Sequence, residues 1–261
     1  MADTRSTEGP EAYDTHSAPI MAPFVAALLD AVHLGPGEAV LDLACGTGFA
    51  ARAAAPLVGP TGLVRGADID EGMIRVARAR GPRIDFTATP ADRLPYDTAT
   101  FDAVVCQQGA QFFPDLAAAF TEASRVTRPG GRFAATIWAP LDRQPYFLAH
   151  ERALRTYAPD ALRYFLRAYV RTAEELTTAL RTAGYRDITH RELTCDIALP
   201  PLDEYAEAHL RALWGGLITE AGGAQALPGA ARLVRDHLAA HTAPDGTATL
   251  PFTVLLVTAT R

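Results

Sequence analysis

The chain has 261 residues, a formal net charge of −6 at pH 7 and an apolar fraction of 49%. This length suits one domain of generous size or a compact domain with additions, and the composition supplies a hydrophobic core. All 24 basic residues are arginine, which excludes chemistry at a lysine amine, and the negative charge excludes a basic surface for nucleic acid or anionic membrane. These features favour a small-molecule partner.

Cysteine usage and hydropathy bear on the compartment. No apolar run approaches the ~18 residues that cross a membrane, and the first residues are polar and acidic. The three cysteines, Cys45, Cys106 and Cys195, lie far apart and lack metal-ligand spacing, so neither a disulfide framework nor a metal site is predicted. We therefore expect a cytoplasmic protein with reduced thiols and no metal ion.

Short apolar runs alternate with helical patterns along the first half of the chain, which is typical of a parallel sheet covered by helices. The predicted strands are residues 39–43, 63–69, 83–87, 101–106, 131–138, 187–197 and 250–260. The predicted helices are residues 20–32, 49–57, 71–80, 116–126 and 172–183, the last with Thr172 as its N-cap. The sequence Pro129-Gly130-Gly131 is expected to separate a helix from a strand.

Two further stretches show helical spacing and interrupt this order. The first, residues 139–170, is rich in arginine, tyrosine and phenylalanine. The second, residues 200–247, contains glycine pairs at 215–216 and 222–223 that are expected to break its helical pattern. Their aromatic content suits a cover over a bound molecule, and it equally suits a dimer interface.

A glycine-rich turn is the most informative segment. Residues 40–50, VLDLACGTGFA, predict a buried strand with an acid near its end, a tight turn and the start of a helix. Gly46 and Gly48 let the backbone approach a ligand closely, and the helix N-terminus offers N–H groups to a negative group. The same turn satisfies the permissive spacing of a nicotinamide-dinucleotide site, so two cofactor classes remain open at this point.

Acidic residues separate the two classes. Asp68, at the end of the second predicted strand, suits the ribose hydroxyls of either cofactor, whereas Asp42 suits an ammonium group and would repel a pyrophosphate. Two further motifs follow in order. They are ADRLPY at residues 91–96, just before FDAVV at 101–105, and RVTRPGGR at 125–132.

With these motifs in this order, residues 13–138 resemble the class I S-adenosyl-L-methionine (SAM)-dependent methyltransferases, in particular the branch of ubiquinone-type and other small-molecule methyltransferases. The resemblance implies an α/β fold with a Rossmann-like, mostly parallel seven-stranded sheet, an antiparallel last strand and helical insertions that form a lid. The implied single domain, residues 1–261, comprises an N-terminal lid or helix (1–35), a SAM-binding core (36–138) and the insertions 139–170 and 200–247.

The resemblance also implies a set of cofactor contacts. The residues implied are Asp42, Ala44, Gly46 and Gly48 around the methionine part, Asp68 at the ribose, Ile69, Met73, Ala91 and Asp92 at the adenine, and Gln107 as a further SAM contact. Ala44 stands where the family has a glycine, a mild change if its φ is negative. Asp92 is expected to replace an acid that the family carries at the position of Pro90.

Acceptor and catalytic residues are implied less directly. Tyr13, His16 and Gln108 are the catalytic candidates, as lid, acid/base or orienting groups. The substrate candidates are Gln111, Phe112, Tyr146, Phe165 and Trp214, and His150 is a candidate for facing the same pocket. The remaining histidines, His33, His190, His209, His237 and His241, show no partner spacing and are expected at the surface.

The function implied is transfer of a methyl group from SAM, with S-adenosyl-L-homocysteine as product, to an oxygen, nitrogen or carbon nucleophile of a small molecule such as a secondary metabolite. One alternative is a SAM-binding protein that catalyses a reaction without methylation or only binds. A second alternative is an NAD-dependent oxidoreductase. We expect a monomer or homodimer with no nucleic-acid or membrane partner.

Overall fold

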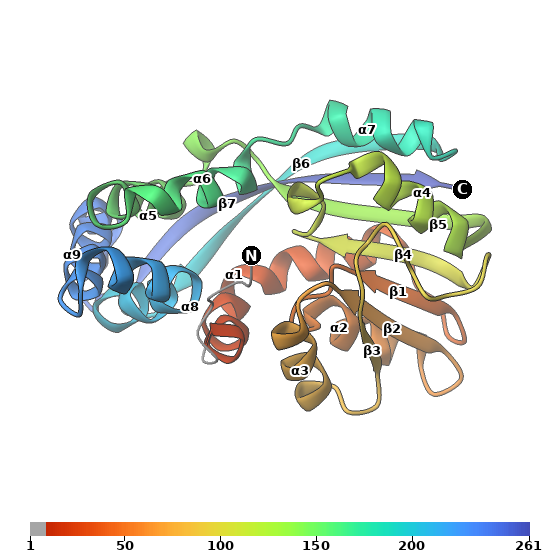
Figure 1. Ribbon diagram of the computed structural model, residues 1–261, viewed down its shortest axis with the longest axis horizontal. Helices are drawn as coiled ribbons and strands as arrows, with labels where there is room; N and C mark the ends of the chain where they lie inside the picture. The colour runs from red at the N-terminus through yellow and green to blue at the C-terminus, as the bar shows by residue number, and fades with distance from the viewer. Residues whose placement is uncertain (1–8) are drawn as a thin grey trace. The chain divides into compact units, whose positions relative to one another are not determined.

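The computed structural model describes residues 9–261 and contains a seven-stranded sheet of strand order β3-β2-β1-β4-β5-β7-β6 (Figure 1). The strands are β1 (Ala39–Leu43), β2 (Leu63–Asp68), β3 (Asp85–Ala88), β4 (Phe101–Gln107), β5 (Thr127–Trp138), β6 (Arg186–Leu199) and β7 (Ala248–Thr260). Strands β1 to β5 pair in parallel, and β7 runs antiparallel to β5. The predicted sheet is confirmed, including its antiparallel last strand.

Nine α-helices connect these strands within the described part of the chain. They are α1 (Gly9–Ala31), α2 (Phe49–Val58), α3 (Glu71–Arg80), α4 (Leu116–Val126), α5 (Pro145–Tyr157), α6 (Leu162–Leu166), α7 (Ala173–Thr182), α8 (Leu202–Gly222) and α9 (Ala226–Leu238). None of the helices in residues 9–261 combines the length and apolar character that crossing a membrane requires.

Local capping explains why several helices begin where the sequence predicts. The side chain of Asp70 accepts hydrogen bonds from the backbone N–H groups of the first turn of α3, and Asp115 does the same for α4. Helix α7 begins with a capping box in which Thr172 and Glu175 bond to each other's backbone N–H. The predicted N-cap at Thr172 is confirmed.

Helix α1 starts well before the predicted residue 20. It begins at Gly9 and includes Pro19 and Pro23, although proline lacks the amide donor of a helix interior. The expectation that Tyr13 and His16 precede the helix is therefore wrong, because both lie within α1. The first eight residues of the predicted N-terminal lid lie outside the described part of the chain.

Two glycine signals are also wrong as predicted. Helix α8 continues through Gly215 and Gly216, so this pair does not break it, whereas the predicted break at Gly222 and Gly223 is confirmed because α8 ends there. Strand β5 begins at Thr127, ahead of the glycines expected to precede it, and its register with β4 shifts there. Pairing across the sheet fixes this segment, since Gly130 N donates to Arg261 O at 2.8 Å and Arg261 N donates to Gly131 O at 2.9 Å.

The chain divides into two compact units. The first, which we call the helical unit, comprises Met1–Met21, Ala139–Val170 and Thr194–Thr253. The second, which we call the sheet unit, comprises Ala22–Trp138, Arg171–Leu193 and Val254–Arg261. Both predicted insertions fall entirely within the helical unit, and the glycine-rich turn falls in the sheet unit.

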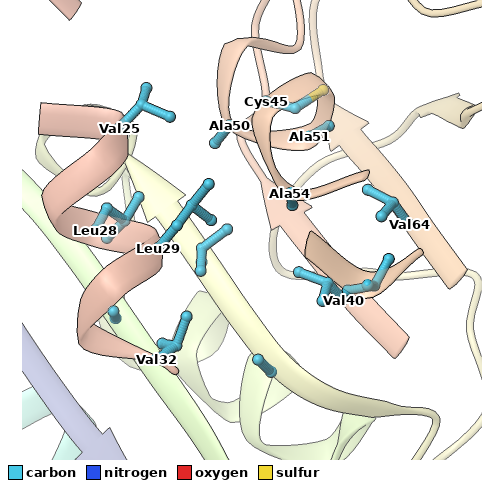
Figure 2. Close-up of a cluster of buried hydrophobic side chains, with 14 of the residues drawn as sticks. Val25, Leu28, Leu29, Val32, Val40, Cys45, Ala50, Ala51, Ala54 and Val64 are labelled. Carbon is cyan, nitrogen blue, oxygen red and sulfur yellow. The ribbon is translucent and has the colours of Figure 1, made fainter. Parts of the chain in front are cut away.

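A tightly packed apolar layer supports the glycine-rich turn in the sheet unit. Figure 2 shows Val25, Leu28 and Leu29 of α1 beside the α2 alanines Ala51 and Ala54, all of them buried. Small side chains on α2 let this helix approach the sheet closely, because a methyl group needs little room. The turn between β1 and α2 therefore connects a strand and a helix that are both held in place by packing in this layer.

Candidate functional site

The glycine-rich turn leaves the carboxyl end of β1. Gly46 and Gly48 both have positive φ, +53° and +84°, which favours glycine. A Cβ atom at position 46 would have no heavy atom within 4 Å, so the backbone there is open to a ligand. A Cβ atom at position 48 would lie 2.9 Å from the ring of Phe86, so Gly48 serves packing within the protein.

Ala44 does not meet the condition under which alanine would replace the family's glycine at little cost. That condition is a negative φ, and the observed φ is +55°. The chain turns away from β1 at this residue while Cys45 N still donates to Ala67 O at 3.0 Å. An L-residue in the left-handed region costs on the order of 1 kcal/mol. Ala44 is therefore a strained position in the turn.

Asp42 is the buried acid of the site, with 1% of its surface exposed. Its Oδ2 accepts a hydrogen bond from Ala51 N at 2.8 Å, and among the described residues Oδ1 has no hydrogen-bond partner. Burial raises the pKa of Asp42 to about 7, the bond from Ala51 and the charge of Arg52 lower it, and the charge of Asp68 raises it. A buried carboxylate oxygen of this kind suits an ammonium group.

Asp68 holds the turn in place from the end of β2. Its Oδ2 accepts from Gly46 N at 2.8 Å, and its Oδ1 accepts from Asp70 N at 2.9 Å. An ionised carboxylate offers about four acceptor positions, so the same group can orient the turn and accept from ribose hydroxyls. The residue lies where the resemblance requires it, and its contact with the ribose stays a prediction.

The residues expected at the adenine follow Asp68. Ile69 exposes 73% of its surface, which is unusual for isoleucine and offers an apolar face to a flat ring. Met73 and Ala91 are half-buried, and Asp92 is exposed. The loop that carries Ala91 and Asp92 is joined to β2 because Thr89 N donates to Asp68 O at 2.8 Å. Their adenine contacts stay predictions.

Two buried amide side chains follow β4. Gln107 ends the strand, Gln108 has a φ of +53°, and Gln111 lies in the short helix Ala110–Phe112. The side-chain amides of Gln108 and Gln111 are buried, and neither their oxygen nor their nitrogen has a hydrogen-bond partner within residues 9–261. Burying unpaired amides is costly, so these groups point to a polar ligand. Phe112, the residue after Gln111, exposes 47% of its surface.

Cysteines near the turn are not nucleophiles. Cys45 and Cys106 are both free and buried. Burial raises the pKa of the Cys106 thiol to about 12 and that of the Cys45 thiol well above its ordinary value. At neutral pH both are therefore thiols. In residues 9–261, no group of three or more His, Cys, Asp or Glu side chains is arranged to hold a metal ion.

The helical unit carries the other predicted substrate residues. Tyr146 and Phe165 are buried, and Trp214 is half-buried. The ring of Phe165 lies 5.8 Å from that of Trp214 and 5.1 Å from that of Tyr169, measured between centroids. These aromatic side chains pack among themselves, and their contact with an acceptor stays a prediction.

Tyr13 and His16 lie on α1 within the helical unit, and both are half-buried. The backbone carbonyl of His16 accepts a hydrogen bond from Tyr205 Oη at 2.6 Å, which joins α1 to α8. Their predicted roles as lid or acid/base groups are not tested by these contacts.

The prediction that His209 lies at the surface is wrong. The residue is 1% exposed, and its Nε2 lies 3.4 Å from Ser17 Oγ. Helical spacing was the available signal, because Leu202, Tyr205 and His209 fall on one face of α8 and all three are buried. His150, the candidate for facing a pocket, is fully buried as well.

Comparisons with known proteins agree on one family. Residues 40–131 match the model of the family described as a methyltransferase domain. The demethylmenaquinone methyltransferase of Streptomyces avermitilis is 36% identical over 178 residues, which cover 63% of this chain and 75% of that protein. The ubiquinone/menaquinone biosynthesis C-methyltransferase of Burkholderia vietnamiensis is 39% identical over 116 residues, 41% of this chain and 48% of that protein.

A solved structure extends the likeness over the whole chain. Phosphoethanolamine N-methyltransferase 2 of Haemonchus contortus, in complex with SAM, aligns with a TM-score of 0.63 and 18% identity. The alignment covers 100% of this chain and 60% of the other. At this identity the likeness shows the fold alone. The matched family segment, residues 40–131, contains the turn, both acids and the buried amides.

Proposed function

Since this chain belongs to the class I SAM-dependent methyltransferases of the ubiquinone and menaquinone type, and so transfers a methyl group from SAM to a small molecule, we propose that its acceptor is a neutral, flat aromatic molecule with hydroxyl or carbonyl oxygens. The relatives are named for quinones, which are flat rings that carry such oxygens. The two alternatives considered from the sequence, a SAM protein without methylation and an NAD-dependent oxidoreductase, are not favoured.

The groups around the turn fit SAM. Asp42 Oδ1, buried and without a partner among the described residues, matches the ammonium group of the cofactor, and Asp68 matches its ribose hydroxyls. Gly46 leaves the backbone open, and the exposed Ile69 supplies an apolar face for the adenine. When bound, SAM supplies a methyl group already attached to a good leaving group.

One observation carries the acceptor class: the amides of Gln108 and Gln111 are buried, and within residues 9–261 they have no hydrogen-bond partner. An amide NH₂ donates to a carbonyl or hydroxyl oxygen, and an amide oxygen accepts from a hydroxyl group. Because glutamine is uncharged, this pair favours a neutral acceptor over an ammonium or a phosphate.

These side chains position the acceptor and do not remove its proton, because an amide is not a base. The chain then contributes by holding donor and acceptor in line and by excluding water. Under this proposal a general base is needed only for those acceptors whose hydroxyl must lose a proton during transfer. An acceptor that reacts at a ring carbon activated by a neighbouring hydroxyl needs less assistance.

The test uses the full chain with SAM and 1,4-dihydroxynaphthalene under reducing conditions, and mass spectrometry detects a product with one added methyl group. We expect Gln108→Ala and Gln111→Ala to lower kcat/KM by about tenfold or more while SAM affinity is kept. Gln225→Ala, at an exposed position before α9, is the matched control. Methylation of an aliphatic amine, with no reaction of hydroxylated aromatic rings, would contradict the proposed acceptor.

We also propose the compartment, assembly state and partners that the sequence predicts. The protein is then a cytoplasmic enzyme, active as a monomer or homodimer, without nucleic-acid or membrane partners. The support for this proposal is the net charge of −6 and the three free cysteines. Light scattering during gel filtration measures the assembly state, and a tetramer or larger assembly would contradict this part of the proposal.

A further inference from the structure

The buried amides of Gln108 and Gln111 belong to a short stretch of the sheet unit, residues 108–113, which we call the amide segment. Its single turn of 3₁₀ helix is closed by two backbone hydrogen bonds, of 2.9 and 3.3 Å. Gln108 has a φ of +53°, a conformation that is costly for a residue with a side chain. Because one such turn is marginal on its own, contacts outside the amide segment must hold it in shape.

The two ends of the amide segment are bonded to other parts of the sheet unit. At the first end, Gln108 N donates to Thr136 O of β5 at 2.9 Å. At the last end, the carbonyl oxygen of Phe113 accepts a hydrogen bond from Arg171 Nη2 at 3.0 Å. Arg171 lies two residues before α7, also in the sheet unit. Its charged guanidinium group makes a stronger bond to a carbonyl than a neutral donor does.

The N-terminus of α7 orients the guanidinium group of Arg171. Glu175 Oε2 accepts from Thr172 N at 2.8 Å within the capping box, so the helix start fixes this carboxylate. Oε1 of the same carboxylate accepts from Arg171 Nη1 at 3.4 Å. The ion pair is partly exposed and contributes little stability by itself, because solvent screens it. Its effect is geometric, since it directs one nitrogen to Glu175 while the other donates to Phe113 O.

We propose that Arg171 is a positioning residue for methyl transfer, whose bond to Phe113 O holds the amide segment so that its two buried amides face the acceptor. This inference rests on the proposed function, because it takes the amides of Gln108 and Gln111 to bind the acceptor. Arg171 itself touches neither the acceptor nor SAM. It acts through Phe113 on the distance and angle of the amide groups, and the rate of transfer is sensitive to both.

The test replaces Arg171 with methionine, which keeps an unbranched side chain and removes both hydrogen bonds, whereas Arg171→Lys restores one charged donor. Two variants are matched controls. Thr172→Ala removes the cap of α7, where Thr172 Oγ1 accepts from Glu175 N at 3.2 Å, and leaves the bonds of Arg171 in place. Arg186→Met removes an arginine that makes the same kind of bond at the start of β6, to Arg261 O at 3.1 Å.

We expect Arg171→Met to lower kcat/KM for 1,4-dihydroxynaphthalene by about tenfold, as much as the loss of one amide, and to leave SAM affinity unchanged. Arg171→Lys should stay within about threefold of wild type. Thr172→Ala should lower the unfolding temperature and keep kcat/KM, and Arg186→Met should keep kcat/KM as well. A wild-type kcat/KM in Arg171→Met would overturn the inference, and so would an equal loss in Thr172→Ala.

Hydrogen exchange reads the amide segment without any acceptor. Arg171→Met should speed exchange of the backbone N–H groups of residues 108–113 by about tenfold or more, whereas both controls should leave it unchanged. In protein labelled with ¹⁵N-glutamine, the side-chain signals of Gln108 and Gln111 should move in Arg171→Met and return toward their wild-type positions in Arg171→Lys. Unchanged exchange together with unmoved signals would overturn the inference.

A cycle of variants tests whether Arg171 acts through the two amides. In a protein that already carries Gln108→Ala and Gln111→Ala, the further change Arg171→Met should lower kcat/KM by about threefold or less, since the groups that it positions are gone. The same tenfold loss in both backgrounds would overturn the inference, because Arg171 would then act on the reaction by another route.

Failure of the inference differs from failure of the proposed function. Methylation of 1,4-dihydroxynaphthalene, with wild-type kinetics and wild-type exchange in Arg171→Met, removes Arg171 from positioning and leaves the function standing. Faster exchange of the amide segment and shifted glutamine signals in Arg171→Met, with no methylation of any hydroxylated ring, remove the proposed acceptor and retain Arg171 as the residue that holds the amides.

Discussion

The methyl group of Ala44 lies where a side chain on residue 109 would begin, since a Cβ atom on Gly109 would be 2.4 Å from Cβ of Ala44. Each of the two positions has the backbone conformation that would suit the residue type found at the other. Ala44 has a φ of +55°, which favours glycine, whereas Gly109 has a φ of −102°, which any residue adopts. The two positions join the glycine-rich turn to the segment that follows β4.

Exchanging the two side chains tests this relationship. Ala44→Gly relieves the left-handed conformation, so we expect the free energy of unfolding to rise by up to about 1 kcal/mol. Gly109→Ala should lower it by about 1–3 kcal/mol through overpacking. In the double variant the clash is gone and most of that loss should be recovered, apart from a closer contact with Cys106 Sγ at 3.1 Å. Urea denaturation measures all four proteins, and additive effects would contradict the contact.

Removing the carboxylate of Asp68 should weaken SAM binding. Asp68→Ala loses an acceptor for two hydroxyl groups and releases Gly46 N, so we expect a loss of about 1.5–3 kcal/mol in binding free energy by calorimetry. Asp102→Ala is the matched control, because Asp102 Oδ2 accepts from Ala39 N at 2.8 Å near the opposite ends of the strands. The control should lose stability and keep SAM affinity, and equal SAM affinities in both variants would place the ribose elsewhere.

SAM affinity should depend on pH through Asp42. With a pKa of about 7, this carboxyl is mostly protonated at pH 6 and mostly ionised at pH 8, and only the ionised form attracts an ammonium group. We expect affinity to rise up to about tenfold over this range in wild type. Asp42→Asn should bind weakly at both pH values. A flat profile in wild type would show that Asp42 does not meet the ammonium group.

The ionisation of Asp42 also affects stability without ligand. Its folded pKa is higher than the ordinary 3.8, so its contribution to the free energy of unfolding is present at low pH and is lost as pH rises through about 7. The apo form of Asp42→Asn should therefore lose less stability than wild type between pH 5 and pH 8, as measured by urea denaturation.

The buried histidines should make the protein sensitive to acid. His150 and His209 have folded pKa values below the ordinary 6.5, so protons bind the unfolded chain first and stability falls as pH drops below 6.5. Each histidine contributes about 1.4 kcal/mol of lost stability per pH unit. His150→Phe should reduce the slope of unfolding free energy against pH between 6.5 and 5, whereas the exposed His190→Phe should not. An unchanged slope in His150→Phe would mean that His150 is protonated in the folded state.

Local signals made much of the sheet unit predictable. The helices 71–80 and 116–126 have the predicted bounds, because an aspartate immediately before each one caps it. The positions of Asp42 and Asp68 beside the turn are predictable from nearby residues as well. The ends of β1 and β2 and the start of α2 can each be recognised from the residues next to them. In such places the sequence itself contains the interaction that fixes the structure.

Interactions between distant residues account for what was missed. Thr127 begins a strand because Gly130 and Gly131 pair with Arg261, at the other end of the chain. The spacing along α8 marks the buried face that carries His209, but no pattern near either residue indicates its contact with Ser17. The conformation of Ala44 depends on the turn as a whole, so its positive φ could not be predicted from its residue type.

Phe86 of β3 fills the space beside glycines from three separate elements. A Cβ atom at Gly48, Gly66 or Gly81 would lie 2.9, 2.4 or 3.2 Å from its ring. This edge-strand ring therefore limits residue size at three positions, and at Gly48 of the cofactor turn it acts together with a φ of +84°, which by itself favours glycine. A smaller residue at position 86 would remove the two closest contacts of a methyl group at position 66 and leave Cys45 Sγ at 3.0 Å, so alanine at 66 should be better tolerated beside a small residue at 86 than beside a ring.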